Sequence, residues 1–268
     1  RALRQAGQVG EIVGSSRRAE HLQEAVDLGV IDRYDTDAAR AVAGADMIVV
    51  CVPLGAMEAA FRSIAPAVSA DAVITDAGSA KASVVAAARA ALGKRLPRFV
   101  PGHPIAGTEK SGVSASFAEL YVNRKVILTP LAETDPAATA RVQAMWEAAG
   151  AQVHCMGVEH HDEVLAATSH LPHVLAFQMV DTLARMSDED EIFRYAAGGF
   201  RDFTRIASSD PVMWRDICLA NAAALLTMLE RYRGDLDRLA AAIRAGDGAE
   251  IERVFRNAKA ARDRHSER

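Results

Sequence analysis

The sequence contains few cysteines, and they are not arranged for cross-linking. Cys51, Cys155 and Cys218 are far apart along the 268 residues and form no C-x-x-C pair. An odd number of separated thiols provides neither a disulfide framework nor a zinc site. We therefore expect reduced thiols, no bound metal and a cytoplasmic protein.

An excess of positive charge is also lacking, and so are long apolar runs. The chain has 31 basic and 35 acidic residues, a formal net charge of -4, which gives no reason to expect binding to nucleic acid or to an anionic membrane. No apolar run reaches the ~18 residues of a membrane helix. The polar residues 1–8 are not followed by the apolar stretch of a signal peptide. A small anionic substrate remains open, provided that cations gather locally.

The first half of the chain alternates short apolar runs with Ala-rich helical stretches. The runs have the length of strands and are nearly continuous, which is typical of a sheet covered on both faces. We expect a doubly wound, mostly parallel α/β domain over residues 1–156. Its expected strands are residues 9–14, 45–52, 72–76, 99–100, 125–129 and 152–156, and its expected helices are residues 17–28, 80–92 and 135–149.

The second half, residues 157–268, has no convincing strand and is expected to be all-helical. Residues 219–229 are apolar almost all round, so a helix there is buried on several sides. We expect a substrate-binding and dimerisation domain whose bundle is completed by a second subunit, giving a homodimer. Burial of this helix within one chain is the alternative. The expected helices are residues 162–186, 188–194, 211–244 and about 250–264.

A G-x-G-x-x-G turn is missing from the sequence. In a parallel α/β domain that binds a dinucleotide, this turn follows the first strand and holds the pyrophosphate on backbone N–H groups. Residues 1–6 look like the last turns of the helix that would follow such a turn, which puts residues 9–14 in the position of the second strand. We therefore expect the first strand and the glycine-rich loop to be absent from this chain.

The end of the second strand meets the adenosine ribose of the coenzyme in such a domain. Ser15, Ser16, Arg17 and Arg18 stand there, with no acidic residue before Glu20. A carboxylate would bind the ribose 2′-hydroxyl of NAD, whereas arginines suit the 2′-phosphate of NADP. We expect NADP rather than NAD. Two solvated arginines at the start of a helix are the alternative.

Two segments at strand ends carry candidate catalytic residues. His103, in PGHPIAGTEK, follows the strand ending at residue 100, and open α/β sheets bind ligands outside the carboxyl ends of their strands. A histidine there can accept a proton near neutral pH, or it can be a structural hydrogen bonder. Ser79, in DAGSAK, can orient an imidazole or a substrate hydroxyl, and it can also cap the next helix.

Two segments of the helical half carry candidate binding residues. His170 and His173, in SHLPH, share a face if the segment is helical; zinc is an alternative that their spacing does not favour. Arg201 and Arg205, in GGFRDFTR, are one helical turn apart, and paired guanidinium groups suit a dicarboxylate. A surface salt-bridge cluster that includes Asp202 is the alternative.

Taken together and in this order, the segments resemble the prephenate/arogenate (cyclohexadienyl) dehydrogenase family over about residues 45–239. The resemblance implies a Rossmann-type N-terminal domain and an all-helical C-terminal domain that dimerises. It also implies an oxidoreductase of tyrosine biosynthesis, which transfers a hydride from the hydroxyl-bearing ring carbon to NAD(P)+ while the ring carboxylate leaves as CO2. The segments are DAGSAK, GHPIAGTEKSG, KVILTP, SHLPH and GGFRDFTRIASSDPVMW, followed by the helical tail.

Carried over to this chain, the resemblance implies roles for individual residues. His103 would take the hydrogen bond and then the proton of the ring hydroxyl, Ser79 would help to orient both, and Arg205 would hold a substrate carboxylate. Family members often have lysine in place of Arg201. The pocket would also be lined by Thr108, Glu109, His170, His173, Arg201 and Trp214, and the coenzyme would contact Val52, Pro53 and Ser79. The position at the end of the second strand adds Ser15, Ser16 and Arg17 to the expected coenzyme contacts.

The substrate and two other function classes stay open at this point. Prephenate is the expected substrate and arogenate the alternative, because the two differ only by a keto group versus an ammonium on the side chain. Glu109 is a candidate acceptor for that ammonium. Another Rossmann hydroxyacid dehydrogenase would need a lysine-centred site, and none lies beside GGFRDFTR. A non-catalytic ligand-sensing dimer could dispense with His103.

Overall fold

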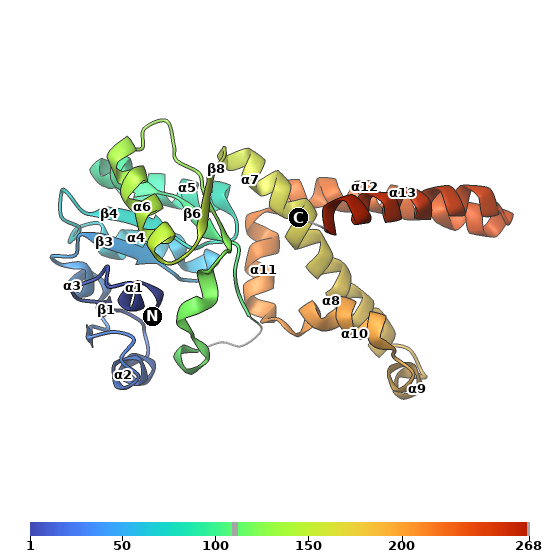
Figure 1. Ribbon diagram of the computed structural model, residues 1–268, viewed down its shortest axis with the longest axis horizontal. Coiled ribbons are helices and arrows are strands. Elements are labelled where there is room, and N and C mark those ends of the chain that lie inside the picture. Colours follow the sequence, from blue (N-terminus) through green and yellow to red (C-terminus); the bar gives the residue numbers. More distant parts are fainter. Residues whose placement is uncertain (109–111, 267–268) are drawn as a thin grey trace. The chain divides into compact units, whose positions relative to one another are not determined.

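A computed structural model describes residues 1–108 and 112–266 of the chain. Two compact units are present, Arg1–Ala222 and Ala223–Arg268. The first unit combines the α/β part with the helices up to α11 (Pro211–Ala220), and helix α7 (Val158–Leu165) packs beside helix α5 (Lys81–Ala91) (Figure 1). Asp162 of α7 accepts hydrogen bonds from the first amides of α5. The domain boundary expected after residue 156 stays a prediction.

Parallel strands form the centre of the α/β part. Strands β3 (Met47–Val50), β4 (Val73–Asp76) and β5 (Phe99–Val100) make one parallel sheet, and every residue of β4 is buried. Strands β7 (Lys125–Leu128) and β8 (Gln152–Cys155) are parallel, whereas β6 (Gly102–Pro104) runs antiparallel to β7. The expected mostly parallel sheet is confirmed, and the short antiparallel strand that carries His103 was not foreseen.

Helices cover both faces of the β3–β5 sheet. Side chains alternate along a strand, so Ile74 packs with Phe61 and Phe99 on one face while Val73 packs with Trp146 on the other. The rings of Phe61 and Phe99 meet edge to face with centroids 5.2 Å apart. The helices of this part are α1 (Ala2–Gln5), α2 (Ala19–Asp27), α3 (Ala38–Val42), α4 (Met57–Ile64), α5 (Lys81–Ala91) and α6 (Pro136–Ala148), with 3-10 turns η1 (Leu54–Ala56), η2 (Gly93–Arg98), η3 (Val113–Ala115) and η4 (Ala118–Tyr121).

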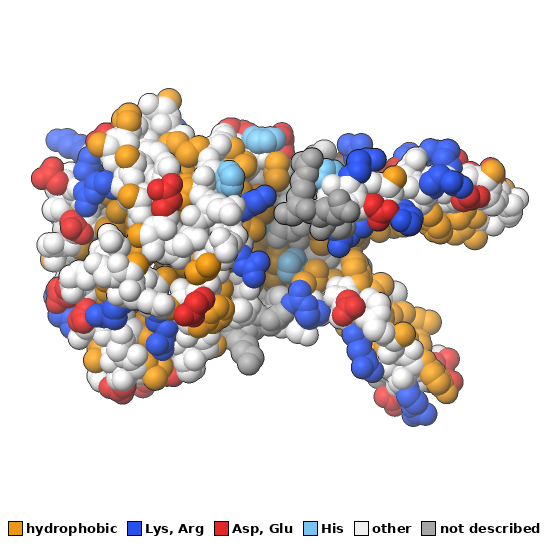
Figure 2. All heavy atoms as spheres, viewed as in Figure 1, with side chains coloured by type: hydrophobic (Ala, Val, Ile, Leu, Met, Phe, Trp, Pro, Cys, Tyr) orange, Lys and Arg blue, Asp and Glu red, His pale blue; other side chains and the backbone are white. Residues whose placement is uncertain are grey.

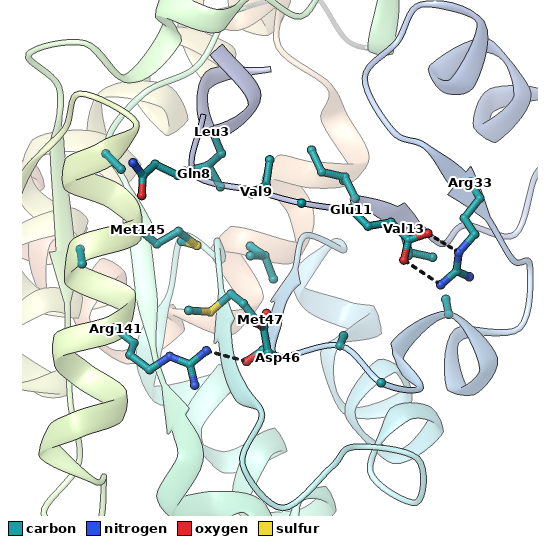
Figure 3. A pocket seen from close by; sticks show the side chains of 18 of the residues that line it. Leu3, Gln8, Val9, Glu11, Val13, Arg33, Asp46, Met47, Arg141 and Met145 are labelled. Atoms are coloured by element: carbon teal, nitrogen blue, oxygen red, sulfur yellow. Dashed lines mark hydrogen bonds and ion pairs between the residues drawn. The ribbon is translucent and has the colours of Figure 1, made fainter. Parts of the chain in front are cut away.

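A slot separates β1 (Val13–Gly14) from β3. Strand β1 pairs in parallel with β2 (Arg33–Tyr34), and no described strand lies between β1 and β3. The space between β1 and β3 is a cavity of about 660 Å³ (Figure 3). Arg141, whose side chain donates to the Asp46 carbonyl, is one of the residues that line this cavity. The strand expected at residues 9–14 shrinks to Val13–Gly14, because residues 9–12 line the slot without a strand partner.

The helix expected at residues 162–186 contains a π-helical turn. Helix α7 (Val158–Leu165) continues through η5 (Ala166–His170) into α8 (Leu171–Ala184). Pro172 lies in the first turn of α8, where it donates no hydrogen bond and its ring would clash with the carbonyl four residues earlier. The wider turn before it accommodates the proline, so the chain stays helical but changes the direction of the side chains around His170.

The helix expected at residues 211–244 is broken at Asn221, which is a correction to the sequence analysis. Asn221 leaves the helical conformation with φ −113° and ψ 35°, and its buried side chain bonds elsewhere. In the first unit the remaining helices are α9 (Glu189–Arg194), α10 (Gly198–Thr204), the 3-10 turn η6 (Arg205–Ser208) and α11 (Pro211–Ala220).

The second unit consists of α13 (Gly248–Ser266) and nearly all of α12 (Ala222–Ala245). Gly246, with φ +66°, ends α12, and the next amide, of Asp247, bonds to the Ala242 carbonyl. Large apolar side chains stay exposed along these helices, including Leu226 at 57% and Phe255 at 57% (Figure 2). Complete burial of residues 219–229 within one chain is therefore wrong.

No single described helix is long and apolar enough to cross a membrane. Only α11 and α12 counted together, across the break at Asn221, reach the required length and composition.

Candidate active site

A buried ion pair lies at the carboxyl end of β4. The Lys81 ammonium is 2.5 Å from Asp76, and both side chains have no exposed surface. Lys81 also donates to the Gly102 carbonyl at 2.6 Å, and Asp76 accepts from the Gly102 amide at 3.0 Å. Burial lowers the pKa of Lys81, and the Asp76 carboxylate opposes that shift. The pair thus ties the start of α5 to β6 next to His103.

Small residues make this close approach possible. A methyl group at Gly78 would lie 2.8 Å from Leu54 and 2.9 Å from an Asp76 carboxylate oxygen. The Gly78 amide instead donates to Asp76 at 2.7 Å. At Gly102 the same methyl would lie 3.1 Å from the Asp76 carbonyl. The glycines of DAGSAK and GHP therefore serve the packing of β4 against β6.

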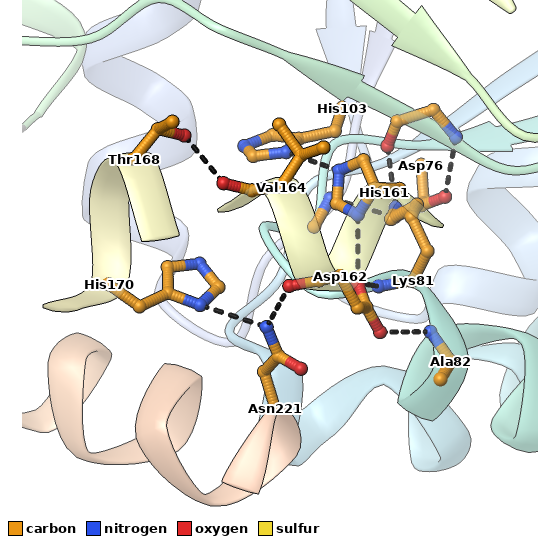
Figure 4. A network of polar contacts seen from close by, with 12 residues as sticks. Asp76, Lys81, Ala82, His103, His161, Asp162, Val164, Thr168, His170 and Asn221 are labelled. Atoms are coloured by element: carbon orange, nitrogen blue, oxygen red, sulfur yellow. Dashed lines mark hydrogen bonds and ion pairs between the residues drawn. The ribbon is translucent and has the colours of Figure 1, made fainter. Parts of the chain in front are cut away.

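His103 is held through its Nδ1 by a second histidine. His161, on α7, places Nε2 at 2.9 Å from His103 Nδ1, and its own Nδ1 lies 2.8 Å from Asp162 Oδ1 (Figure 4). His161 is fully buried and His103 is 8% exposed. Burial, together with Lys81, lowers the pKa of His103 well below its ordinary value. The lowered pKa favours the neutral form of His103, which is the form that can accept a proton.

Asp162 also caps helix α5. Its two oxygens accept from the backbone amides of Lys81 at 2.7 Å and Ala82 at 2.9 Å. Burial acts to raise the pKa of Asp162, but hydrogen bonds from His161 and from these amides outweigh it and lower the pKa. The alternative role of Ser79 as the cap of this helix is therefore wrong. The N-cap position is Ala80, and the capping oxygens come from Asp162.

Ser79 is half-buried and lies in the loop between β4 and α5. Its hydroxyl makes no hydrogen bond to any residue in the described part of the chain, so it is available to a ligand. The hydrogen bond that orients the His103 ring comes from His161, a residue that stands in none of the sequence motifs.

The two histidines of SHLPH pack against Trp214. His173 stacks on the indole with ring centroids 3.6 Å apart, and His170 meets it edge-on at 6.1 Å. Asn221 donates to the Asp162 carbonyl at 2.8 Å and lies 3.1 Å from His170 Nδ1. Burial lowers the pKa of His170 to about 4 and also lowers that of His173. The structure therefore brings His170, His173 and Trp214 into one cluster beside Asp162.

The arginine pair lies on an adjacent, more exposed surface. Arg201, in α10, and Arg205, at the start of η6, are both exposed, and their segments contact α8, the helix of His173. Arg201 forms no ion pair with a described residue, so the salt-bridge cluster suggested for it is not found. Thr108 is exposed, and Glu109 lies outside the described residues.

The expected coenzyme residues line the ends of β1 and β3. Ser15, Ser16 and Arg17 follow β1 directly and are exposed, while Val52 is half-buried and Pro53 exposed after β3. Within residues 1–108 and 112–266, the side chains of Arg17 and Arg18 make no hydrogen bond and no ion pair. The described residues contain no group of ligating side chains that could hold a metal ion.

Known families match both halves of the chain. The family model described as "Prephenate dehydrogenase, nucleotide-binding domain" matches residues 1–155, and the one described as "Prephenate dehydrogenase, dimerization domain" matches residues 157–257. The chain belongs to the prephenate dehydrogenase family. It is accordingly an oxidoreductase with a nicotinamide-binding Rossmann-type domain followed by a helical dimerisation domain, as the sequence predicted.

Relatives and solved structures agree with this assignment. The cyclohexadienyl dehydrogenase of Zymomonas mobilis subsp. mobilis is 42% identical over 240 residues, which are 89% of this chain and 80% of the relative. The prephenate dehydrogenase of Bacillus subtilis is 35% identical over 94% of this chain and 68% of its own length. The prephenate dehydrogenase of A. aeolicus, solved with hydroxyphenyl propionate and NAD+, superposes with a TM-score of 0.91 at 39% identity, covering 98% of this chain and 92% of that one. A Synechocystis arogenate dehydrogenase, 28% identical, gives a TM-score of 0.81 and covers 98% of this chain and 94% of that one.

Proposed function

We propose that this chain oxidises and decarboxylates prephenate to 4-hydroxyphenylpyruvate in tyrosine biosynthesis, with His103 as the base. The observation that carries this proposal is the buried His103, held through Nδ1 at the carboxyl edge of the β4–β5 sheet, where burial lowers its pKa. A histidine in this state can accept a hydroxyl proton at neutral pH. Arogenate, which would give tyrosine by the same chemistry, is the alternative substrate.

The reaction needs one proton acceptor and correct placement of the substrate. His103 Nε2 accepts the proton of the ring hydroxyl. A bound nicotinamide coenzyme would supply the oxidising power by taking the hydride of the same ring carbon. The ring carboxylate then departs as CO2, its electrons complete the aromatic ring, and the phenolate oxygen recovers the proton from His103. Because aromatisation drives these steps, the protein contributes mainly position and charge.

Anchoring of the substrate is assigned to the helical part of the first unit. Arg205 binds one carboxylate and Arg201 the other, since guanidinium groups grip carboxylates through two hydrogen bonds. His173, stacked on Trp214, lies on α8, which contacts the segments of both arginines. The hydroxyl of Ser79, which bonds to no described residue, is assigned to the ring hydroxyl or the nicotinamide. Thr108, Glu109 and His170 complete the proposed pocket.

NADP+ is the proposed coenzyme. The support is the exposed Arg17 and Arg18 at the end of β1, which pair with no residue that the structure describes. Nearby Arg33 is instead bound to Glu11 at 2.8 Å (Figure 3). An unpaired guanidinium next to the adenosine ribose favours a 2′-phosphate.

A homodimer through the helical part is proposed as the assembly. The support is the match to a dimerisation domain and the exposed apolar side chains of the second unit. Leu226→Lys should shift the molecular mass in light scattering from dimer to monomer, whereas Arg231→Lys, on the same helix, should leave it unchanged. The separated, unpaired cysteines support a reducing cytoplasm as the location.

The test is an assay of prephenate and arogenate, each with NAD+ and NADP+. The chain is used with an N-terminal extension, a strand and a glycine-rich loop, built to fill the slot between β1 and β3. Formation of reduced coenzyme with an equal amount of CO2 is the expected result, and the rate ratios identify substrate and coenzyme. No reaction in all four mixtures, with a folded protein that binds coenzyme, would overturn the proposal.

His103→Asn provides the matching variant. Asparagine cannot take the proton, so kcat should fall by ~10²–10⁴-fold while coenzyme affinity is kept. His154→Asn, in strand β8, is the control and should keep full activity. An active His103→Asn protein would remove His103 from the role of base.

A further inference from the structure

We propose that His161 and Asp162 are positioning residues that hold His103 in the tautomer with its proton on Nδ1, leaving Nε2 as the acceptor for the substrate hydroxyl. This inference rests on the proposed function of His103. The geometry that points to it is a continuous buried row, Asp162–His161–His103, with contacts of 2.8 Å and 2.9 Å (Figure 4).

Asp162 fixes which atoms donate and which accept along the row. Its oxygens accept from the amides of Lys81 and Ala82, which can only donate, and Oδ1 also contacts His161 Nδ1. Asp162 sits at the N-terminus of α5, where the partial positive charge of the helix favours a carboxylate over a carboxylic acid. An ionised carboxylate has no proton to give, so His161 Nδ1 must carry the hydrogen.

The remaining assignments follow from this one. A neutral imidazole with its proton on Nδ1 has a lone pair on Nε2. His161 Nε2 therefore accepts from His103 Nδ1, which in turn leaves the lone pair of His103 on Nε2. A doubly protonated His161 would reverse the last contact and put a hydrogen on His103 Nε2, but it would also place a positive charge on a ring with no exposed surface.

The row also determines where the positive and negative charges reside during the reaction. When His103 Nε2 takes the hydroxyl proton, the ring becomes an imidazolium whose Nδ1–H still donates to His161. Asp162 gains no proton, and its negative charge stabilises the imidazolium through the intervening ring. The proton returns from His103 Nε2 to the phenolate oxygen when CO2 has left. His161, which has no exposed surface, acts only through His103.

The tautomer can be measured without turnover. In the chain labelled with 15N on histidine, long-range 1H–15N correlation spectra at neutral pH distinguish a protonated from an unprotonated ring nitrogen. His103 signals are identified by their loss in His103→Asn. The expected result is a protonated Nδ1 and an unprotonated Nε2. A protonated His103 Nε2 in the wild-type chain would overturn the inference, whatever the enzyme assay shows.

Two substitutions at His161 separate polarity from packing. Glutamine can donate its amide to Asp162 and accept from His103 with its carbonyl, so His161→Gln should preserve the His103 tautomer and most of kcat. Phenylalanine fills the volume without either hydrogen bond, so in His161→Phe the proton of His103 should no longer be fixed on Nδ1. We expect kcat to fall by ~10–100-fold with little change in substrate KM. Both variants are compared at equal folded fraction, from thermal unfolding monitored by circular dichroism.

His160→Gln is the matched control, because His160 is the neighbouring residue on α7 with a side chain 66% exposed. It should leave the His103 tautomer and kcat unchanged. Equal losses in His161→Gln and His161→Phe, with the His103 tautomer unaltered in both, would mean that His161 is structural only. If instead the tautomer is as expected but His103→Asn stays active, the proposed role of His103 as the base is wrong, while the assignment of the His103 tautomer to the hydrogen-bonded row is kept.

Discussion

The Asp162 carboxylate accepts a hydrogen bond from the backbone amide of Lys81 at 2.7 Å, so α7 caps the helix that follows β4. The same carboxylate accepts from His161, which holds His103. One charged group thus stabilises the start of α5 and orients the candidate base. The sequence separates the two residues by 81 positions, so neither role is visible from local pattern alone.

Removal of this cap should destabilise the protein more than removal of an ordinary one. Asp162→Ala leaves the amides of Lys81 and Ala82 and the buried His161 without their acceptor, so we expect a loss of ~3 kcal/mol or more in the free energy of unfolding. Asp210→Ala removes a simple exposed cap from α11 and should cost about 1 kcal/mol. Urea unfolding of both variants gives the comparison, and equal losses would contradict it.

Removing both partners of the buried ion pair should destabilise the protein less than removing only one. Lys81→Met leaves Asp76 as an uncompensated buried charge, and we expect a loss of ~3–5 kcal/mol in the free energy of unfolding. The double variant Asp76→Leu with Lys81→Met should recover part of that loss. Arg62→Met, which breaks the exposed pair with Glu58, should cost less than about 1 kcal/mol.

Activity should persist below pH 6.5. A base must be unprotonated, and burial, Lys81, His161 and His170 together lower the pKa of His103. As the pH falls, kcat/KM should therefore stay level through 6.5 and decline only when the pH passes the lowered pKa. A pH profile of kcat/KM tests this in wild type. A decline centred at or above 6.5 would mean that the titrating base is a different or a solvated group.

The arginines after β1 should discriminate between the coenzymes. Arg17→Ser combined with Arg18→Ser removes the two unpaired guanidinium groups, so the KM for NADP+ should rise by ~10-fold or more and the KM for NAD+ should change little. Arg33→Ser is the control, because its guanidinium is already engaged by Glu11. An equal effect of the double variant on both coenzymes would argue against contact with a 2′-phosphate.

Several strands and helices were predicted within a few residues because their apolar patterns are strong. The strand expected at residues 72–76 appears as Val73–Asp76, and the helix expected at residues 135–149 appears as Pro136–Ala148, capped by Asp135. Local signals suffice in these cases, since a continuous apolar run and a capped helix with proline in its first turn need no distant partner.

The elements that were predicted wrongly depend on distant partners. Residues 9–12 have strand-like composition but no neighbouring strand in the slot, and a strand exists only where it is paired. The helix expected through residue 221 breaks there because the Asn221 side chain bonds to the Asp162 carbonyl and lies against His170. Helix propensity is a weak preference that such buried contacts override.

By itself, the sequence determined the α/β-then-helical order of the chain, the family, and the candidate residues His103, Ser79 and Arg205, because apolar periodicity and short motifs are local properties. Tertiary structure alone decided which residues meet: His161 against His103, Asp162 at the start of α5, and Lys81 buried on Asp76. Hydrogen bonds act over about 3 Å, and only folding brings groups so distant in sequence within that reach.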